Sequence, residues 1–288
     1  MTPDPVSVDE VCRYLESYAP ARLAEDWDNT GLLIGNMQGV VQQVMTCLTV
    51  TPETVKEAID RQVQLIVTHH PLPFRPLKTI TRSTIAGGMV LDLIEAGIAV
   101  YSPHTSFDSA AEGINQQLAE KLGLSKIVPL RPFDNDPDHL GAGRWGHLET
   151  AATLDQWVAK LCREFSISGL QIVAAPSATI QTVGIACGAA GSFLDAAISA
   201  GCDAFVTGET NFHTCLEAKA QQITLALPGH YASERFAVEN LAQRLQETFP
   251  NIDVRPSIDE TDPLRWVCLL YTSPSPRDQR GSRMAACA

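Results

Sequence analysis

Short β-branched apolar runs alternate along the chain with stretches in which apolar residues recur at helical spacing. In the first half, helical spacing predicts helices over 8–18, from the cap at Thr51 onward, over 83–95 and over 112–122. Apolar runs that stop at polar or proline-rich turns predict strands over 44–50, 65–68 and 98–101. Repeated strand–helix units of this kind favour an α/β protein with a mostly parallel sheet that helices cover on both faces.

The pattern changes between residues 129 and 146, where prolines, glycines and acids replace apolar residues. We interpret this stretch as the crossing into a second domain. Beyond it we predict helices over 154–165 and 211–220 and strands over 170–174, 182–187, 204–207 and 223–227. A long amphipathic helix is predicted from His230 to about Glu247, with a last strand over 252–254.

Composition and charge narrow the class of protein. The chain is 45% hydrophobic and 19% charged, which is ordinary for a soluble globular protein. Its net charge of −12 argues against nucleic acid as a partner, because proteins that bind nucleic acid carry a basic face. No apolar run approaches the roughly 20 residues of a membrane helix, and the first residues do not resemble a secretion signal. Eight scattered cysteines without a Cys-x-x-Cys pair indicate free thiols, so we expect a cytoplasmic protein.

The last stretch, residues 271–288, departs from the rest of the chain. It has no apolar periodicity, and residues 271–283 carry three arginines and one aspartate. A functional basic tail is one interpretation. We favour a non-native or disordered tail, such as translated adaptor or frame-shifted sequence, and leave it out of the fold prediction.

Residues of the types that bind metal ions lie where predicted strands end. His69 and His70 close one strand, Asp108 follows another, and His230 and Glu234 lie four residues apart at the start of a helix. The carboxyl ends of strands are where open α/β sheets bind ligands. Imidazoles and carboxylates without thiolates suit zinc, manganese, iron or nickel. Five ligands exceed the need of one tetrahedral ion, so we predict two divalent ions per chain with a bridging carboxylate.

Other histidines and turns admit more ordinary interpretations. His104 is either a sixth ligand or a residue that orients a ligand through a hydrogen bond, and we take His104 and Glu234 as candidate catalytic residues. A single histidine is more often a surface or hydrogen-bonded core residue, which is our interpretation of His139 and His147. The pair His230 and Glu234 is also compatible with helix capping and surface charge.

Several motifs in this order make the chain resemble a known family, the GTP cyclohydrolase I type 2 homologues. These proteins are also called Ngg-interacting-factor-three-like dinuclear-metal hexameric proteins. The resemblance covers about residues 7–268, in the short form without the large inserted domain. It rests on 27–32 (WDNTGL), 68–71 (THHP), 104–108 (HTSFD), 207–209 (TGE) with His213, and 229–234 (GHYASE).

The resemblance implies a fold and a set of ligands. It implies metal ligands at His69, His70, Asp108, His230 and Glu234, a ring of six subunits, and a two-lobed α/β fold with the dinuclear site at the strand carboxyl ends. Each lobe would be a mostly parallel or mixed sheet flanked by helices. The first, metal-binding domain would be discontinuous, over 1–125 and 229–268, with a second α/β domain over 126–228. The tail after Cys268 has no counterpart in the family.

The activity implied by the family name is hydrolytic opening of the purine ring of GTP. Chemically, hydroxide generated at a two-metal site attacks a purine carbon or a phosphorus atom equally well. We therefore expect a hydrolase acting on a nucleotide or a related heterocyclic or phosphate compound. The alternative is a non-catalytic metal-binding scaffold or metal chaperone.

Three further features keep two interpretations each. Glu209 and His213 are either substrate or supporting groups or ordinary helix-cap residues. The turn 188–191 (GAAG) lacks the lysine of a phosphate-binding loop, so a tight turn is the better interpretation. Asp28 and Asn29 either orient a ligand or form an Asx-turn.

Overall fold

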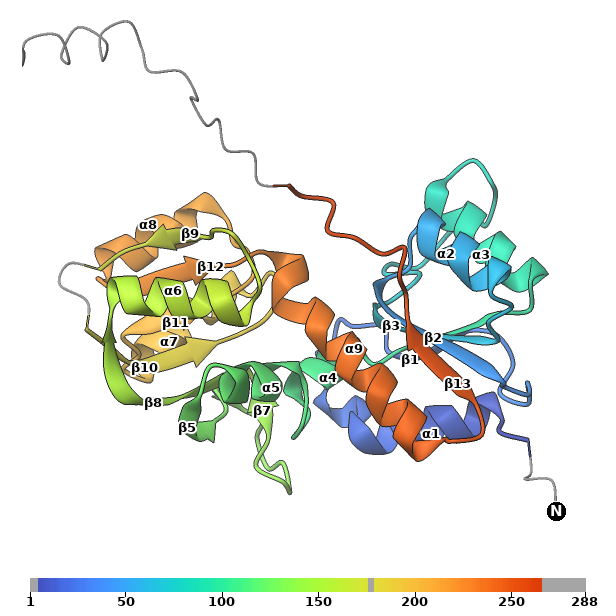
Figure 1. Cartoon of the computed structure of the whole chain (residues 1–288), viewed down its shortest axis with the longest axis horizontal. Coiled ribbons are helices and arrows are strands. Elements are labelled where there is room, and N and C mark those ends of the chain that lie inside the picture. The colour runs from blue at the N-terminus through green and yellow to red at the C-terminus, as the bar shows by residue number, and fades with distance from the viewer. Residues whose placement is uncertain (1–4, 176–178, 266–288) are drawn as a thin grey trace, which may run out of the picture.

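The computed structural model describes residues 5–175 and 179–265, which form two α/β lobes joined by a long helix (Figure 1). The first lobe holds a five-stranded sheet in the order β1-β4-β3-β2-β13, parallel except for the antiparallel edge strand β1. Its strands are β1 (Gly31–Ile34), β2 (Gln43–Thr49), β3 (Leu65–His70), β4 (Ala99–Ser102) and β13 (Asp253–Pro256). Its helices are α1 (Val8–Tyr18), α2 (Pro52–Asp60), α3 (Ile85–Glu95), α4 (His104–Ser109) and α5 (Ile114–Lys121), with a 3₁₀ turn η1 (Ala21–Leu23).

The faces of this sheet follow from side-chain alternation in β3. Leu65 and Val67 join the core that includes α1 and the long helix, whereas Ile66 joins the core under α2 and α3. Both faces are therefore apolar, as a central parallel strand requires. Two helices begin where the sequence predicts, because the hydroxyls of Ser7 and Thr51 each cap a helix in a capping box.

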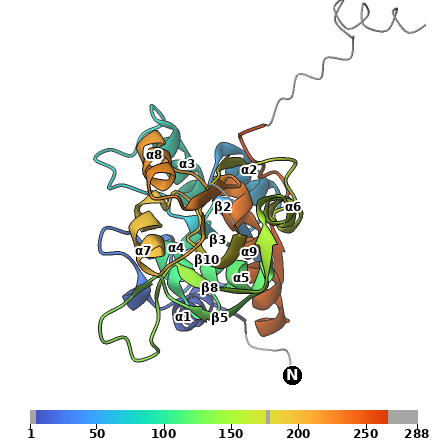
Figure 2. The same cartoon turned by 90° about the vertical axis from the view of Figure 1, so that its left-hand side faces the viewer.

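The second lobe holds a mixed six-stranded sheet in the order β5-β8-β10-β11-β12-β9. Its strands are β5 (Leu124–Val128), β8 (Arg144–Thr153), β9 (Gln171–Val173), β10 (Thr179–Ile185), β11 (Ala204–Val206) and β12 (Thr224–Leu227), with the small hairpin β6 (Arg131–Pro132) and β7 (Gly141–Ala142) beside it. Figure 2 shows α6 (Leu154–Glu164) on one side of the sheet and α7 (Leu194–Ser199) with α8 (Phe212–Ala220) on the other. A 3₁₀ turn η2 (Gly191–Phe193) precedes α7.

The helix α9 (His230–Thr248) connects the lobes. It starts directly after β12 of the second sheet, and its body packs against β2 and β13 of the first sheet. Val238, Leu241 and Leu245 are all buried, as the amphipathic pattern predicts. One apolar core runs continuously from α1 and α9 to residues of the second sheet such as Val183 and Val206.

The α/β class and the helix over Val8–Tyr18 are confirmed. The stretch 129–146, which we interpret from the sequence as the crossing into a second domain, has regular structure of its own. This stretch contains the hairpin β6–β7 and the start of β8, and β5 already belongs to the second sheet across the expected boundary at 125/126. The sequence pattern does not predict β8, because most side chains in the second half of this strand are exposed and several are small. The segment becomes a strand through its pairing with β5 and β10. The segment 104–108, which follows the strand β4, lies in the short helix α4.

Two further expectations concern the whole chain. In the part of the chain that the structure describes, no helix has the length and apolar character of a membrane span. The cysteines among these residues are free thiols, as expected. The tail over 271–288 lies outside the described residues.

Candidate metal centre

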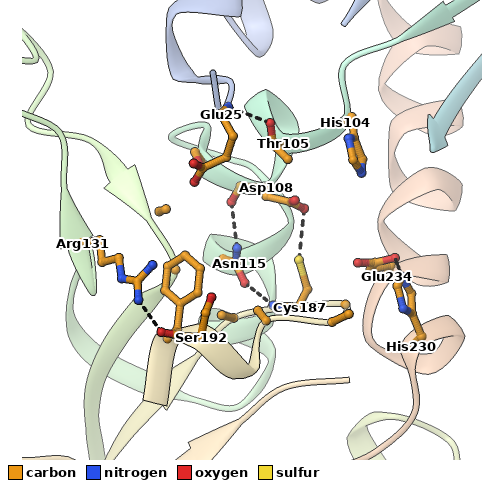
Figure 3. Close-up of a pocket in the computed structure, with 18 of the residues that line it drawn as sticks. Glu25, His104, Thr105, Asp108, Asn115, Arg131, Cys187, Ser192, His230 and Glu234 are labelled. Carbon is orange, nitrogen blue, oxygen red and sulfur yellow. Dashed lines mark hydrogen bonds and ion pairs between the residues drawn. The ribbon is translucent and has the colours of Figure 1, made fainter. Parts of the chain in front are cut away.

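Six titratable side chains from three elements converge at the carboxyl end of the first sheet, and Figure 3 shows four of them, His104, Asp108, His230 and Glu234. They are His69 and His70 of β3, His104 and Asp108 of α4, and His230 and Glu234 of α9. Three overlapping groups of three have their ligand atoms within 4.8 Å of one another. The structure therefore brings together every residue predicted as a metal ligand or as catalytic.

Local structure explains how two adjacent histidines reach one site. Pairing of β3 with β4 ends at Val67, whereas β2 still pairs with β3 through Thr49 and His70. Side chains at the end of a strand that is paired on one side only are free to turn toward the same space. The two imidazole centroids lie 4.9 Å apart.

Glu234 lies at the centre of the cluster and is buried. Its Oε2 atom lies 3.0 Å from Nε2 of His230 and 3.3 Å from Nε2 of His70, and its Oε1 atom lies 3.8 Å from Nε2 of His69. Asp108 approaches from the other side, with Oδ1 at 3.7 Å from Nε2 of His69. Apart from the imidazoles of His70 and His230, no hydrogen-bond donor among the described residues reaches the buried Oε2 atom of Glu234.

Three of the histidines are oriented by partners outside the cluster. Nδ1 of His70 lies 2.7 Å from Oγ1 of Thr49, and Nδ1 of His230 lies 2.9 Å from Oε1 of Glu209. When Nδ1 of a histidine is held in this way, Nε2 is directed at the ligand, which is the usual arrangement around a protein-bound metal ion.

His104 is oriented in the same manner by Asp28. Its Nδ1 lies 2.6 Å from Oδ1 of Asp28, and the other oxygen of Asp28 accepts hydrogen bonds from the backbone N–H and the hydroxyl of Thr105. His104 has a φ of 29°, a backbone region that non-glycine residues rarely adopt, and these bonds hold it there. The polar turn that contains Asp28 is therefore a support for the cluster.

Cys187, which sequence reasoning missed, supports Asp108. It follows β10 of the second sheet, and its thiol donates to Oδ1 of Asp108 at 3.0 Å. Asn115 joins the two residues, because it donates to the carbonyl of Asp108 and accepts from the backbone N–H of Cys187. The one available signal is that Cys187 ends a predicted strand, the same position that singled out His70.

Two glycines leave room for the cluster. A Cβ atom on Gly188 would lie 2.3 Å from Oε1 of Glu234, and one on Gly208 would lie 2.7 Å from the hydroxyl of Ser233. Gly188 also has a φ of 64°, in the left-handed region that favours glycine. The segment 188–191 (GAAG) is therefore a turn, and the side chain of Glu234 packs directly against its first glycine.

Burial and mutual charge shift the pKa values of the cluster. Burial, reinforced by the negative charge of Glu234, raises the pKa of Asp108 to about 7. Burial also opposes the charge on Glu234, but the surrounding histidines hold its pKa well below its usual range. Burial lowers the pKa of His69 well below its ordinary value, whereas hydrogen bonds to Glu234 and Glu209 outweigh burial and raise that of His230 to about 9.

These residues fit a metal centre. The site offers inward-facing imidazole nitrogens, the buried carboxylate of Glu234 and the half-buried carboxylate of Asp108, and the outer nitrogens of three histidines are already held. A bound cation would balance the negative charge of Glu234, which the adjacent imidazoles alone otherwise offset.

A cavity of about 480 Å³ opens beside the cluster and is lined by His70, His104, Asp108, His230 and Glu234. Its volume lies in the range of small-molecule sites. Of the remaining candidate residues, one contacts the cluster and the others lie away from it. Glu209 contacts His230, whereas His213 lies on the exposed surface of α8, His139 lies in an exposed turn, and His147 of β8 is paired with Thr182.

Comparison with known proteins identifies the family of the chain. Residues 6–263 match the family described as Duf34/NIF3 (NGG1p interacting factor 3). The chain is 30% identical over 241 residues to a GTP cyclohydrolase 1 type 2 homolog of Clostridium acetobutylicum, covering 84% of this chain and 90% of that protein. It is 35% identical over 229 residues to NIF3-like protein 1 of Drosophila melanogaster, covering 78% and 77%. The crystal structure of Staphylococcus aureus hypothetical protein SA1388 superposes with a TM-score of 0.83 at 27% identity, covering 92% of this chain and 100% of that one. The chain therefore belongs to the Duf34/NIF3 family.

Proposed function

We propose that the chain is a metal-dependent hydrolase that binds two divalent ions through His69, His70, Asp108, His230 and Glu234. Its substrate would be a nucleotide or a related heterocyclic or phosphate compound. The observation that carries the proposal is the convergence of five ligand-type side chains, four of which line a cavity that is large enough for a small molecule. The names of relatives such as the C. acetobutylicum GTP cyclohydrolase 1 type 2 homolog support a nucleotide.

The residues of the chain divide the work of such a reaction. Bound divalent ions would supply Lewis-acid activation of water and of substrate oxygen atoms. His104 lines the cavity, and its pairing with Asp28 through Nδ1 leaves Nε2 for proton transfer to or from a bound molecule. Glu234, buried among three imidazoles, fixes the spacing of the ligands.

The test is turnover of GTP and a nucleotide panel by protein reloaded with zinc or manganese. We expect product formation that a chelator or Glu234→Gln abolishes. Glu239→Gln is the matched control, because Glu239 lies on the same helix and is exposed. His69→Ala guards against a contaminating enzyme. Turnover that survives both metal removal and Glu234→Gln would contradict the mechanism.

A second cavity supports the alternative of a non-catalytic scaffold or metal chaperone. This cavity, of about 640 Å³, also reaches His70 and His230, and it is lined by the acids Glu53, Glu209 and Asp259. Access to the same histidines from two cavities suits the passage of an ion as well as it suits catalysis. Metal transfer to a chelating acceptor without turnover of any nucleotide would favour this alternative.

We propose a ring of six subunits, as the family resemblance implies, and a cytoplasmic location. Large apolar side chains such as Ile85 and Phe212 are more than 70% exposed in the single chain, which supports burial against other copies. The free cysteines among the described residues support a reducing compartment. Light scattering tests the assembly, and a monomer would contradict it.

A further inference from the structure

Two exposed aromatic rings stand at the cavity beside the cluster. Trp27 and Phe74 both line it, and their side chains are 63% and 50% exposed. Their ring centroids lie 6.1 Å apart, and each lies 5.9 Å from the ring centroid of His104. Large exposed aromatic rings beside polar catalytic groups are typical of ligand-binding walls.

The two loops that carry these rings are tied together. The side-chain amide of Asn29 donates to the carbonyl of Pro73 at 2.8 Å, which links the segment after Trp27 to the segment before Phe74. The next residue after Trp27 is Asp28, which is itself fixed by His104 and Thr105. The aromatic pair is therefore held in place before any ligand binds, which lowers the entropic cost of binding.

Arg131 lines the same cavity from the second lobe (Figure 3). Its guanidinium stacks on the ring of Phe193, with a centroid distance of 4.1 Å, and donates to the carbonyl of Ser192. No carboxylate of the described residues lies within ion-pair distance of it, although Glu25 lines the same cavity. Among the described lining residues it is the only lysine or arginine. Since one of five N–H donors is used, the others remain for an anion.

The cavity thus combines flat apolar rings, an oriented cation and the ligand cluster. We propose that it binds an aromatic heterocycle that carries an anionic group, in which Trp27 and Phe74 hold the ring and Arg131 holds the anion. This inference deepens the proposed function and rests on it for the chemistry, but not for the binding. A nucleoside monophosphate has both parts, so it is the simplest probe.

Each part of the probe reports on its own residue. Isothermal titration of the zinc-reloaded full chain should show binding of GMP and weaker binding of guanosine. Trp27→Leu and Phe74→Leu should each weaken both ligands roughly 10-fold, the magnitude of base–aromatic stacking. Arg131→Gln should weaken GMP roughly 10-fold or more and leave guanosine unchanged, because it removes only the charge-assisted hydrogen bonds.

Matched variants separate these effects from general surface changes. Phe212→Leu removes an aromatic ring that is 72% exposed on α8, outside the cavity, and Arg163→Gln removes an exposed arginine of α6. Neither should change the affinity for GMP. Arg131→Lys should restore part of that affinity, since it restores the charge without the planar fork. Repeating the titration after chelation shows how much of the phosphate contact the metal contributes.

Several outcomes would overturn the proposal. They are the absence of binding of either probe to the unaltered protein, equal loss of GMP and guanosine in Arg131→Gln, and unchanged affinities in both aromatic variants. A fall in assembly mass with unchanged affinity in Trp27→Leu would assign that ring to contact with another copy of the chain. Binding as predicted without any turnover would remove the proposed hydrolase and keep this inference. Turnover with an unchanged KM in the Trp27 and Arg131 variants would do the reverse.

Discussion

His70 and His230 face each other through their Nε2 atoms at 3.2 Å, although they are 160 residues apart in the chain. Nδ1 of each ring is occupied by a separate partner, Thr49 in one case and Glu209 in the other. The carboxylate of Glu234 lies beside both imidazoles. Imidazoles that are held in this way are oriented to bind one shared cation.

The first prediction concerns metal content. Protein that is stripped with chelator and reloaded with zinc or manganese should approach two ions per chain by elemental analysis. His230→Ala should lower that number, because it removes one of the facing nitrogens. His213→Ala is the control, since His213 lies on the exposed surface of α8. A chain that stays metal-free on reloading would refute the metal centre.

The second prediction concerns Gly188. In Gly188→Ala the new Cβ would lie 2.3 Å from Oε1 of Glu234, and the φ of 64° would become strained. Because the carboxylate must move, metal affinity should fall by at least roughly 10-fold. In the control Gly88→Ala on α3, nothing lies within 4 Å of the new methyl group, so metal content should not change and stability should rise by up to about 1 kcal/mol. Equal metal affinity in the two variants would show that Glu234 does not need this space.

The third prediction concerns the support of His104. Asp28→Asn should leave the fold intact but weaken the orientation of the imidazole, because an amide cannot accept through both oxygen positions as Asp28 does. Activity or metal affinity should fall roughly 10- to 100-fold, the usual effect of losing an outer partner. Asp155→Asn, on α6 in the second lobe, is the control. An Asp28→Asn protein with full activity and metal content would make this pair a merely structural turn.

The fourth prediction concerns acid stability and Glu57. Burial alone would raise the pKa of Glu57, but hydrogen bonds from Ser257 and the backbone of Ile258, together with Arg61, hold it below its usual range. A carboxylate with a lowered folded-state pKa stabilises the fold above its unfolded pKa of about 4.3, and this stability is lost as the pH falls through the folded pKa.

Urea unfolding of the unaltered chain and of Glu57→Gln at several pH values tests this prediction. The difference in the free energy of unfolding should be largest near pH 7 and should narrow below about pH 4. The exposed Glu217→Gln should show no such narrowing. A difference that is constant across this range would mean that the charge of Glu57 contributes nothing.

Features set by neighbouring residues could be predicted from the sequence, and features set by distant contacts could not. The caps at Ser7 and Thr51 depend on residues three positions away, so the start of α1 and α2 follows from the sequence. The proximity of His69 and Asp108 also follows, because the carboxyl ends of the neighbouring parallel strands β3 and β4 lie at one edge of the first sheet. His230 follows β12 of the second sheet, so its place beside them depends on how α9 packs between the lobes.

By contrast, the partners that orient these side chains are brought near only by the tertiary fold. Thr49 has no local signal that distinguishes it from other threonines, and the one signal for Cys187 is its place at the end of a predicted strand. The strand β8 was missed for a related reason, since its residues become a strand through pairing with β5 and β10.

The position of α9 has a consequence for the contact between the two lobes. The helix leaves the second sheet after β12, contributes His230 and Glu234 at its first turn, and then packs on the first sheet. A rotation of the lobes in which the first turn of α9 moved with the second sheet would separate these residues from His69 and His70. An ion bound by residues of both α9 and β3 would stabilise the docked arrangement of the lobes, by mass action, by RT ln(1 + [metal]/Kd). Hydrogen exchange at the junction should consequently slow as metal is added, while exchange in the interior of each sheet stays the same.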